Sequence, residues 1–197
     1  AAPTVRALAN SYTPPESWRA NLSWSQQMLG TALTLDGEYS LNLHQASQLN
    51  LNFSDRPSFD LPSEDGRPVF VPAASIVPTT GAESPVDSRR VADYAQVLET
   101  TSDLKSDARQ IIITAGPLGV TSNRFVATAS YAFTDAHTQT RGFDGSTFGD
   151  PSAVEWSRSG LTPVNQFVLQ AGFNSSLATI TVFAKVSSGL PFTPIVG

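Results

Sequence analysis

Polar and apolar side chains alternate with a period of two in several stretches of this chain. Between residues 123 and 135, one side of the segment carries Phe125, Ala127, Ala129, Tyr131 and Phe133. The other side carries Arg124, Thr128 and Ser130. Because successive side chains of a β-strand point to opposite faces, this period predicts a strand with one apolar and one polar face.

The pattern predicts six strands, at residues 17–27, 32–44, 94–116, 123–135, 164–174 and 177–187. No segment of useful length has a helical period, and prolines and glycines are scattered throughout, so we expect an all-β fold. The third segment allows two interpretations, because residues 94–116 are longer than the others. They form one long strand or contain a hairpin turn at Asp103–Asp107, and the spacing of the links favours one strand.

The links between these strands alternate in length. Three are short, near residues 27–32, 116–123 and 173–177, and two are long, at about 45–93 and 135–163. This rhythm is typical of outer-membrane barrels, which have tight periplasmic turns and long extracellular loops. It predicts an antiparallel up-and-down meander in one open, curved sheet that is a segment of a transmembrane β-barrel. The competing interpretation is a soluble sandwich, in which two sheets bury their apolar stripes against each other.

In the barrel interpretation, the apolar faces contact lipid and the polar faces line a water-filled interior. The lipid-facing set is Phe125, Tyr131, Phe133, Phe167, Leu169, Phe173, Ile180 and Val182, and the interior set is Arg124, Gln166, Gln170 and Lys185. Aromatic residues tend to lie near the ends of the stripes, as in the aromatic girdles of membrane barrels. A sandwich core would place them in mid-strand.

The composition of the chain excludes several classes of function and of site. The 197 residues carry a net charge of -5, so no basic stripe is present to bind nucleic acid. Cysteine is absent, which rules out disulfides and thiolate metal sites. No uninterrupted apolar run reaches the ~18 residues that a transmembrane helix needs.

Candidate chemistry is sparse. His44 and His137 lie near the loop ends of predicted strands, and a metal site there would need further ligands such as Asp135 or Glu38. Isolated histidines at a rim are usually solvated polar residues. The acids Asp36 and Glu38 share one strand face, and charge on a water-filled wall explains them better than an acid–base pair. We therefore expect no enzyme and no catalytic, cofactor or metal site.

Several motifs, taken together in their order, resemble TonB-dependent outer-membrane receptors of the Oar-like type. They are Gly66-Arg67-Pro68-Val69-Phe70-Val71-Pro72, Ser102-Asp103-Leu104-Lys105-Ser106, Arg141-Gly142-Phe143-Asp144-Gly145, Phe148-Gly149-Asp150-Pro151 and Ser188-Gly189-Leu190-Pro191-Phe192-Thr193-Pro194. The likeness covers nearly the whole chain.

The resemblance implies a barrel of ~22 strands with a plugged lumen, powered through the TonB complex. Residues 1–197 would then be part of that barrel domain, about six strands, with the plug and the C-terminal strands outside this sequence. The implied location is the bacterial cell outer membrane. The implied partners are membrane lipid, the TonB complex through the plug, and an unidentified extracellular ligand met by the loops 45–93 and 135–163. The alternatives are a secreted β-sandwich binding or adhesin module and a passive outer-membrane barrel.

Overall fold

The computed structural model describes residues 2–28, 30–118, 124–142, 150 and 152–190. Its strands are β1 (Thr4–Leu8), β2 (Glu16–Met28), β3 (Thr31–Asn50), β4 (Phe59–Leu61), β5 (Arg67–Val69), β6 (Gln96–Leu118), β7 (Phe125–Arg141), β8 (Val154–Arg158), β9 (Asn165–Asn174) and β10 (Thr179–Ser187). Short 3-10 helices lie at Pro62–Glu64, Ala73–Ser75 and Pro85–Ser88. Among the described residues, no helix has the length and apolar character to cross a membrane.

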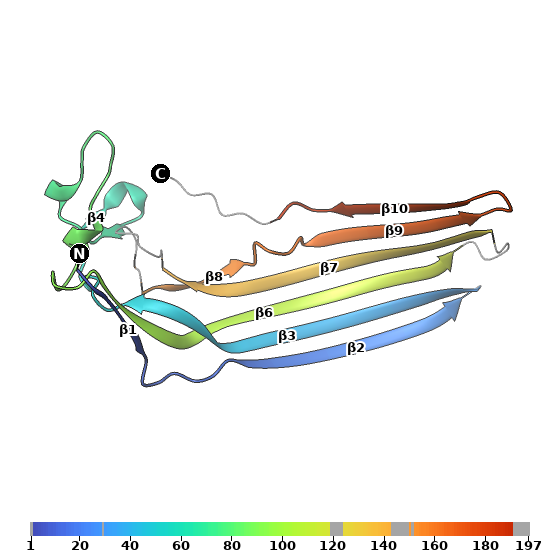
Figure 1. The fold of residues 1–197 in the computed structure, drawn as a ribbon, viewed down its shortest axis with the longest axis horizontal. Coiled ribbons are helices and arrows are strands. Elements are labelled where there is room, and N and C mark those ends of the chain that lie inside the picture. Colours follow the sequence, from blue (N-terminus) through green and yellow to red (C-terminus); the bar gives the residue numbers. More distant parts are fainter. Residues whose placement is uncertain (1, 29, 119–123, 143–149, 151, 191–197) are drawn as a thin grey trace. The chain divides into compact units, whose positions relative to one another are not determined.

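The main sheet has the strand order β10-β9-β7-β6-β3-β2, so each strand pairs with the next one of the meander (Figure 1). β1 pairs with β6 in parallel, β8 pairs with β7, and β4 and β5 form a separate hairpin. β2 and β10 are the edges of this order, so the sheet is open. The expected all-β, antiparallel, open meander is confirmed.

All six predicted strands are present, and several extend beyond their predicted limits. β6 runs without interruption through Asp103–Asp107, so the alternative of a hairpin turn there is wrong. β3 continues through Gln45–Gln48 to Asn50, beyond its predicted end at residue 44. The strands missed by the sequence analysis, β1, β4, β5 and β8, have only three to five residues each.

The chain divides into two compact units. Unit 1 contains Ala1–Glu16, Leu43–Lys105 and Gln139–Trp156, and unit 2 contains Ser17–Asn42, Ser106–Thr138 and Ser157–Gly197. Within unit 2, β2, β6 and β9 end at the same end of the sheet at which β3, β7 and β10 begin (Figure 1). That placement follows from the antiparallel order, in which every second link returns to the same end.

Unit 1 holds most of the buried apolar side chains of the described residues. They are Ala9, Val69, Phe70, Val71, Leu98 and Leu104. The ring of Phe70 also packs against Phe53, with centroids 5.1 Å apart. This small core anchors the proline-rich link between β3 and β6, which is therefore a folded segment.

The side chain of Asn52 hydrogen-bonds the beginning of that link to backbone groups near its end. Its side chain is 3% exposed; its amide donates to the carbonyls of Val91 (3.0 Å) and Tyr94 (2.8 Å), and its Oδ1 accepts from the Val91 N–H (2.9 Å). Buried polar groups need such partners, because an unpaired one keeps its full desolvation cost. Asn52 thereby closes a loop of about forty residues within unit 1.

Candidate functional site

The apolar stripes of unit 2 lie on one face of the sheet. Residues that pair directly across an antiparallel ladder point to the same side. Phe125 pairs with Phe173, which pairs with Ile180 on the next strand. Tyr131 pairs in the same way with Phe167 and Ile113. The stripes of β6, β7, β9 and β10 therefore form a single continuous surface.

This surface is open to its surroundings. Val182 is 53% exposed and Ile180 is 57% exposed, although both are fully apolar. Of the eight side chains predicted to face lipid, seven are exposed and Leu169 is partly exposed. Ala127 is the one buried apolar residue of unit 2 within the described ranges. No second layer covers this face in the part of the chain that the structure describes.

The paired residues form rows of different chemistry along the strands. Near the short links, one row contains Phe125, Phe173 and Ile180. The next two rows contain the smaller side chains Ala127, Ala171, Val182, Ala129, Leu169 and Ala184. The following two contain Tyr131, Phe167, Ile113, Val186, Phe133 and Ile111. Aromatic rows thus flank an aliphatic middle, as the sequence analysis expected.

Charge begins where this apolar surface ends. On the same face, the next cross-strand pair after Ile111 and Phe133 is Arg109 with Asp135, followed by Asp107 with His137. Arg158 also approaches Asp135, with 3.5 Å between its Nη2 and the carboxylate Oδ1. A continuous apolar surface on β6 and β7 is therefore bounded by a band of opposite charges.

The other face of unit 2 is joined by polar side chains across four strands. Ser17 of β2 donates to Asn42 of β3 (2.8 Å), and Asn42 donates to Ser106 of β6 (3.0 Å). Gln110 of β6 then donates to Thr134 of β7 (3.0 Å). Asp36 and Glu38 also line this face, in a shallow cavity of about 230 Å³ together with Asn21, Ser23 and Gln110.

Three of the four side chains predicted to face the interior lie within strands. They are Gln166, Gln170 and Lys185, which pair with Ala132, Phe183 and Val168. All three are therefore on the face of the sheet that is opposite to the aromatic rows. Two exposed apolar residues, Val126 and Phe183, also lie on this polar face, and the sequence analysis missed them. Both are apolar at positions where the period of two predicts a polar side chain, so the pattern did not identify them.

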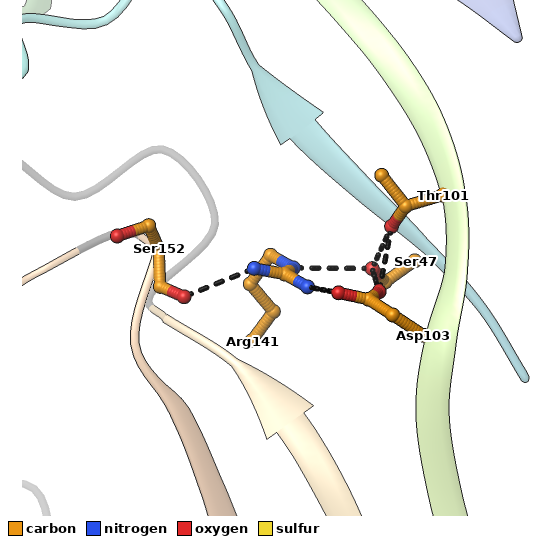
Figure 2. Close-up of polar contacts among 5 residues, drawn as sticks. All are labelled: Ser47, Thr101, Asp103, Arg141 and Ser152. Atoms are coloured by element: carbon orange, nitrogen blue, oxygen red, sulfur yellow. Dashed lines mark hydrogen bonds and ion pairs between the residues drawn. The ribbon is translucent and has the colours of Figure 1, made fainter. Parts of the chain in front are cut away.

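In unit 1 the side chain of Arg141 gathers a polar cluster at the end of β7 (Figure 2). Its guanidinium forms an ion pair with Asp103 of β6 and donates to the Ser47 Oγ of β3 (3.2 Å). It also donates to the carbonyl of Ser152, ahead of β8 (3.0 Å). The Arg141 side chain is 10% exposed, so its charge depends on these partners.

Asp103 is held in its charged form. Partial burial alone raises the pKa of its carboxyl, but hydrogen bonds from Arg141 and Thr101 and the charge of Arg141 outweigh that effect. The result is a pKa below the ordinary value. The Thr101 hydroxyl donates over 2.9 Å and is itself 2.7 Å from Ser47 Oγ.

The histidines do not form a recognisable metal site. His137 Nε2 lies 3.7 Å from Asp135 Oδ1, and His44 occupies a left-handed backbone position in β3 with φ of 57°. Among the described residues, no three His, Asp or Glu side chains converge as metal ligands would. The motif residues 143–149, Pro151 and 191–197 lie outside the described residues.

Unit 2 therefore has a sheet with one exposed apolar face and one polar face, and unit 1 contains a folded loop region with the Arg141 cluster. No protein-family model, curated protein or solved structure matches this chain.

Proposed function

We propose that this chain is part of the wall of an outer-membrane β-barrel that imports a ligand with energy from the TonB complex. The observation that carries the proposal is the exposed apolar face of unit 2, with its aromatic rows, aliphatic middle and charged boundary. Lipid-facing surfaces of membrane barrels have this order of side chains.

The height of the apolar face supports contact with a bilayer. From Phe125 to Phe133 the strand advances eight residues, or about 27 Å at ~3.4 Å per residue. With a strand tilt of ~40°, this corresponds to about 20 Å along the membrane normal, and the aromatic rings add to it. The apolar band of outer-membrane barrels is ~25 Å tall.

The open edges support the wall of a larger barrel. β2 and β10 each pair on one side only within the described sheet, which leaves rows of backbone donors and acceptors without ladder partners. In lipid such groups cost several kcal/mol each, so a sheet in a membrane has to close. Further strands beside β2 and β10 would complete the ladder.

The active, TonB-coupled form of transport rests on the Oar-like resemblance of the motifs. If the resemblance holds, the folded link between β3 and β6 contributes to an extracellular vestibule that first meets the ligand. A passive barrel would share the same wall, and a plug sequence encoded upstream would separate the two. A soluble sandwich module would instead need a second layer over Phe125, Phe167 and Ile180.

A pair of arginine substitutions tests the lipid-facing assignment. Leu169→Arg places a charge in the aliphatic middle of the apolar face and should cost about 2–4 kcal/mol of folding free energy in lipid. Gln170→Arg, one residue along on the polar face, should be nearly neutral. Refolding titrations of the parent barrel in lipid vesicles measure both. Equal costs at the two positions would contradict the proposal.

A further inference from the structure

Unit 1 contains a cavity of about 400 Å³ beside the Phe53–Phe70 pair. Its apolar lining comes from Leu49, Leu51, Phe53, Pro57, Pro68 and Phe70. Its charged lining comes from Asp55, Arg90 and Asp150. Pockets of ~300–1,000 Å³ with an apolar lining and a few polar groups are typical of small-ligand sites.

Two of the polar residues that line the cavity are engaged in holding the loop together. Asn50 Oδ1 accepts hydrogen bonds from the N–H groups of Asn52 and Val97, each at 3.1 Å. The hydroxyl of Ser54 donates to the carbonyl of Arg56 over 2.9 Å. These contacts shape the cavity, and the Asn50 Oδ1 and the Ser54 hydroxyl already have partners without a ligand.

The charged residues retain binding capacity. Arg90 and Asp55 are 3.9 Å apart at their closest atoms, which is too far for a hydrogen bond, and their side chains are 53% and 67% exposed. Asp150 uses one carboxylate oxygen, Oδ1, for the N–H (2.8 Å) and hydroxyl (2.7 Å) of Ser152. Its Oδ2 has no partner among the described residues.

We propose that this cavity binds a short peptide with free termini and an apolar side chain. The apolar side chain would pack against Phe53 and the prolines. The ammonium group would meet the carboxylate of Asp150 or Asp55, and the carboxylate would meet Arg90, whose planar guanidinium suits bidentate pairing. The cavity thus offers both signs of charge around an apolar floor, which matches a zwitterionic ligand.

An oligosaccharide fits this lining less well. Sugars pack their C–H faces on a flat aromatic ring, and the described lining contains neither Trp nor Tyr. The two Phe rings are tilted at 58° to each other and pack together. Fixed charges of both signs are also of little use to a neutral sugar, whereas they orient a peptide.

Peptide binding by unit 1 does not depend on a membrane. Its meaning as cargo capture rests on the proposed function, in which this loop belongs to the mouth of the barrel. The two ideas therefore fail separately. The substitutions Leu169→Arg and Gln170→Arg on β9 test the barrel proposal, and a binding titration tests peptide binding by the cavity.

The titration uses the full chain in detergent micelles, with leucyl-leucyl-glycine with free termini as the probe. Its N-acetylated form and maltotriose are the comparison ligands. Asp150→Asn keeps an oxygen for the Ser152 contacts, and Arg90→Gln keeps a polar side chain, so both should leave the fold intact. Asp87→Asn and Arg56→Gln are matched controls, because neither residue lines the cavity.

We expect saturable binding of the free tripeptide that weakens about tenfold or more in each cavity variant, as the loss of a charged hydrogen bond implies. The controls should change affinity by about twofold at most, as for exposed charges. Acetylation of the amino terminus should weaken binding of the probe. No saturable binding, equal loss in variants and controls, or preferential binding of maltotriose would overturn the inference, even if the β9 pair supports the barrel.

Discussion

At the scale of single residues, the Arg141 cluster is the clearest stabilising feature of unit 1. One nearly buried guanidinium joins β6, β3 and the segment ahead of β8 through Asp103, Ser47 and Ser152. A buried cation without its counter-charge is strongly unfavourable, so loss of Asp103 should loosen all three contacts. Arg141 and Ser47 are separated by 94 residues and Arg141 and Asp103 by 38, and no motif in the sequence links them.

The lowered pKa of Asp103 predicts a pH dependence of unit 1. A carboxyl with a folded pKa below its unfolded value of 3.8 stabilises the fold above that value. This contribution should disappear as the pH falls through the folded pKa. The stability difference between the native chain and Asp103→Asn should therefore be largest near neutral pH and shrink below 3.8.

Limited proteolysis of the segment 139–156 across that pH range measures the difference. Asp60→Asn is the control, because Asp60 is exposed on β4 and has no ion-pair partner among the described residues. A difference between native chain and Asp103→Asn that is independent of pH would contradict the role assigned to the ion pair.

At the scale of elements, alternation predicted the long strands because each has at least one stretch in which apolar side chains recur at every second residue. The same signal cannot find β1 or β8, since five residues contain too few repeats to separate a strand from chance. It also missed the cavity of unit 1, whose lining comes from a proline-rich link, β3, and residues 150 and 152. Its long-range contacts depend on the tertiary fold.

Asn52 provides the test at this scale. Asn52→Ala leaves the Val91 N–H and the Val91 and Tyr94 carbonyls without their side-chain partner at a partly buried position. We expect a loss of about 2–3 kcal/mol in the stability of unit 1. Amide hydrogen exchange of residues 88–97 should rise in parallel. Asn21→Ala, at an exposed position of β2, should leave both unchanged, and an equal effect of the two variants would contradict the fastening role.

At the scale of the whole molecule, the proposed function requires that the two faces of one sheet meet different surroundings. Sequence alternation grouped the apolar side chains of β7, β9 and β10 on one face, and the cross-strand register places them on one face too. It could not place Phe183 and Val126, which are apolar on the polar face. Their presence means that apolarity alone does not identify the lipid side, so a measurement has to distinguish the two environments directly.

Neighbouring residues of β10 allow that measurement. Val182 and Phe183 are 53% and 65% exposed and lie on opposite faces. The chain has no native cysteine, so Val182→Cys and Phe183→Cys each give a single site for a nitroxide label in the barrel reconstituted in lipid. If residue 182 faces lipid, oxygen, which partitions into lipid, should relax the label at 182 more than the label at 183. A water-soluble nickel complex should relax the label at 183 more. Equal accessibility of the two labels to both reagents, or the reverse preference, would contradict the lipid-facing assignment on which the proposed function rests.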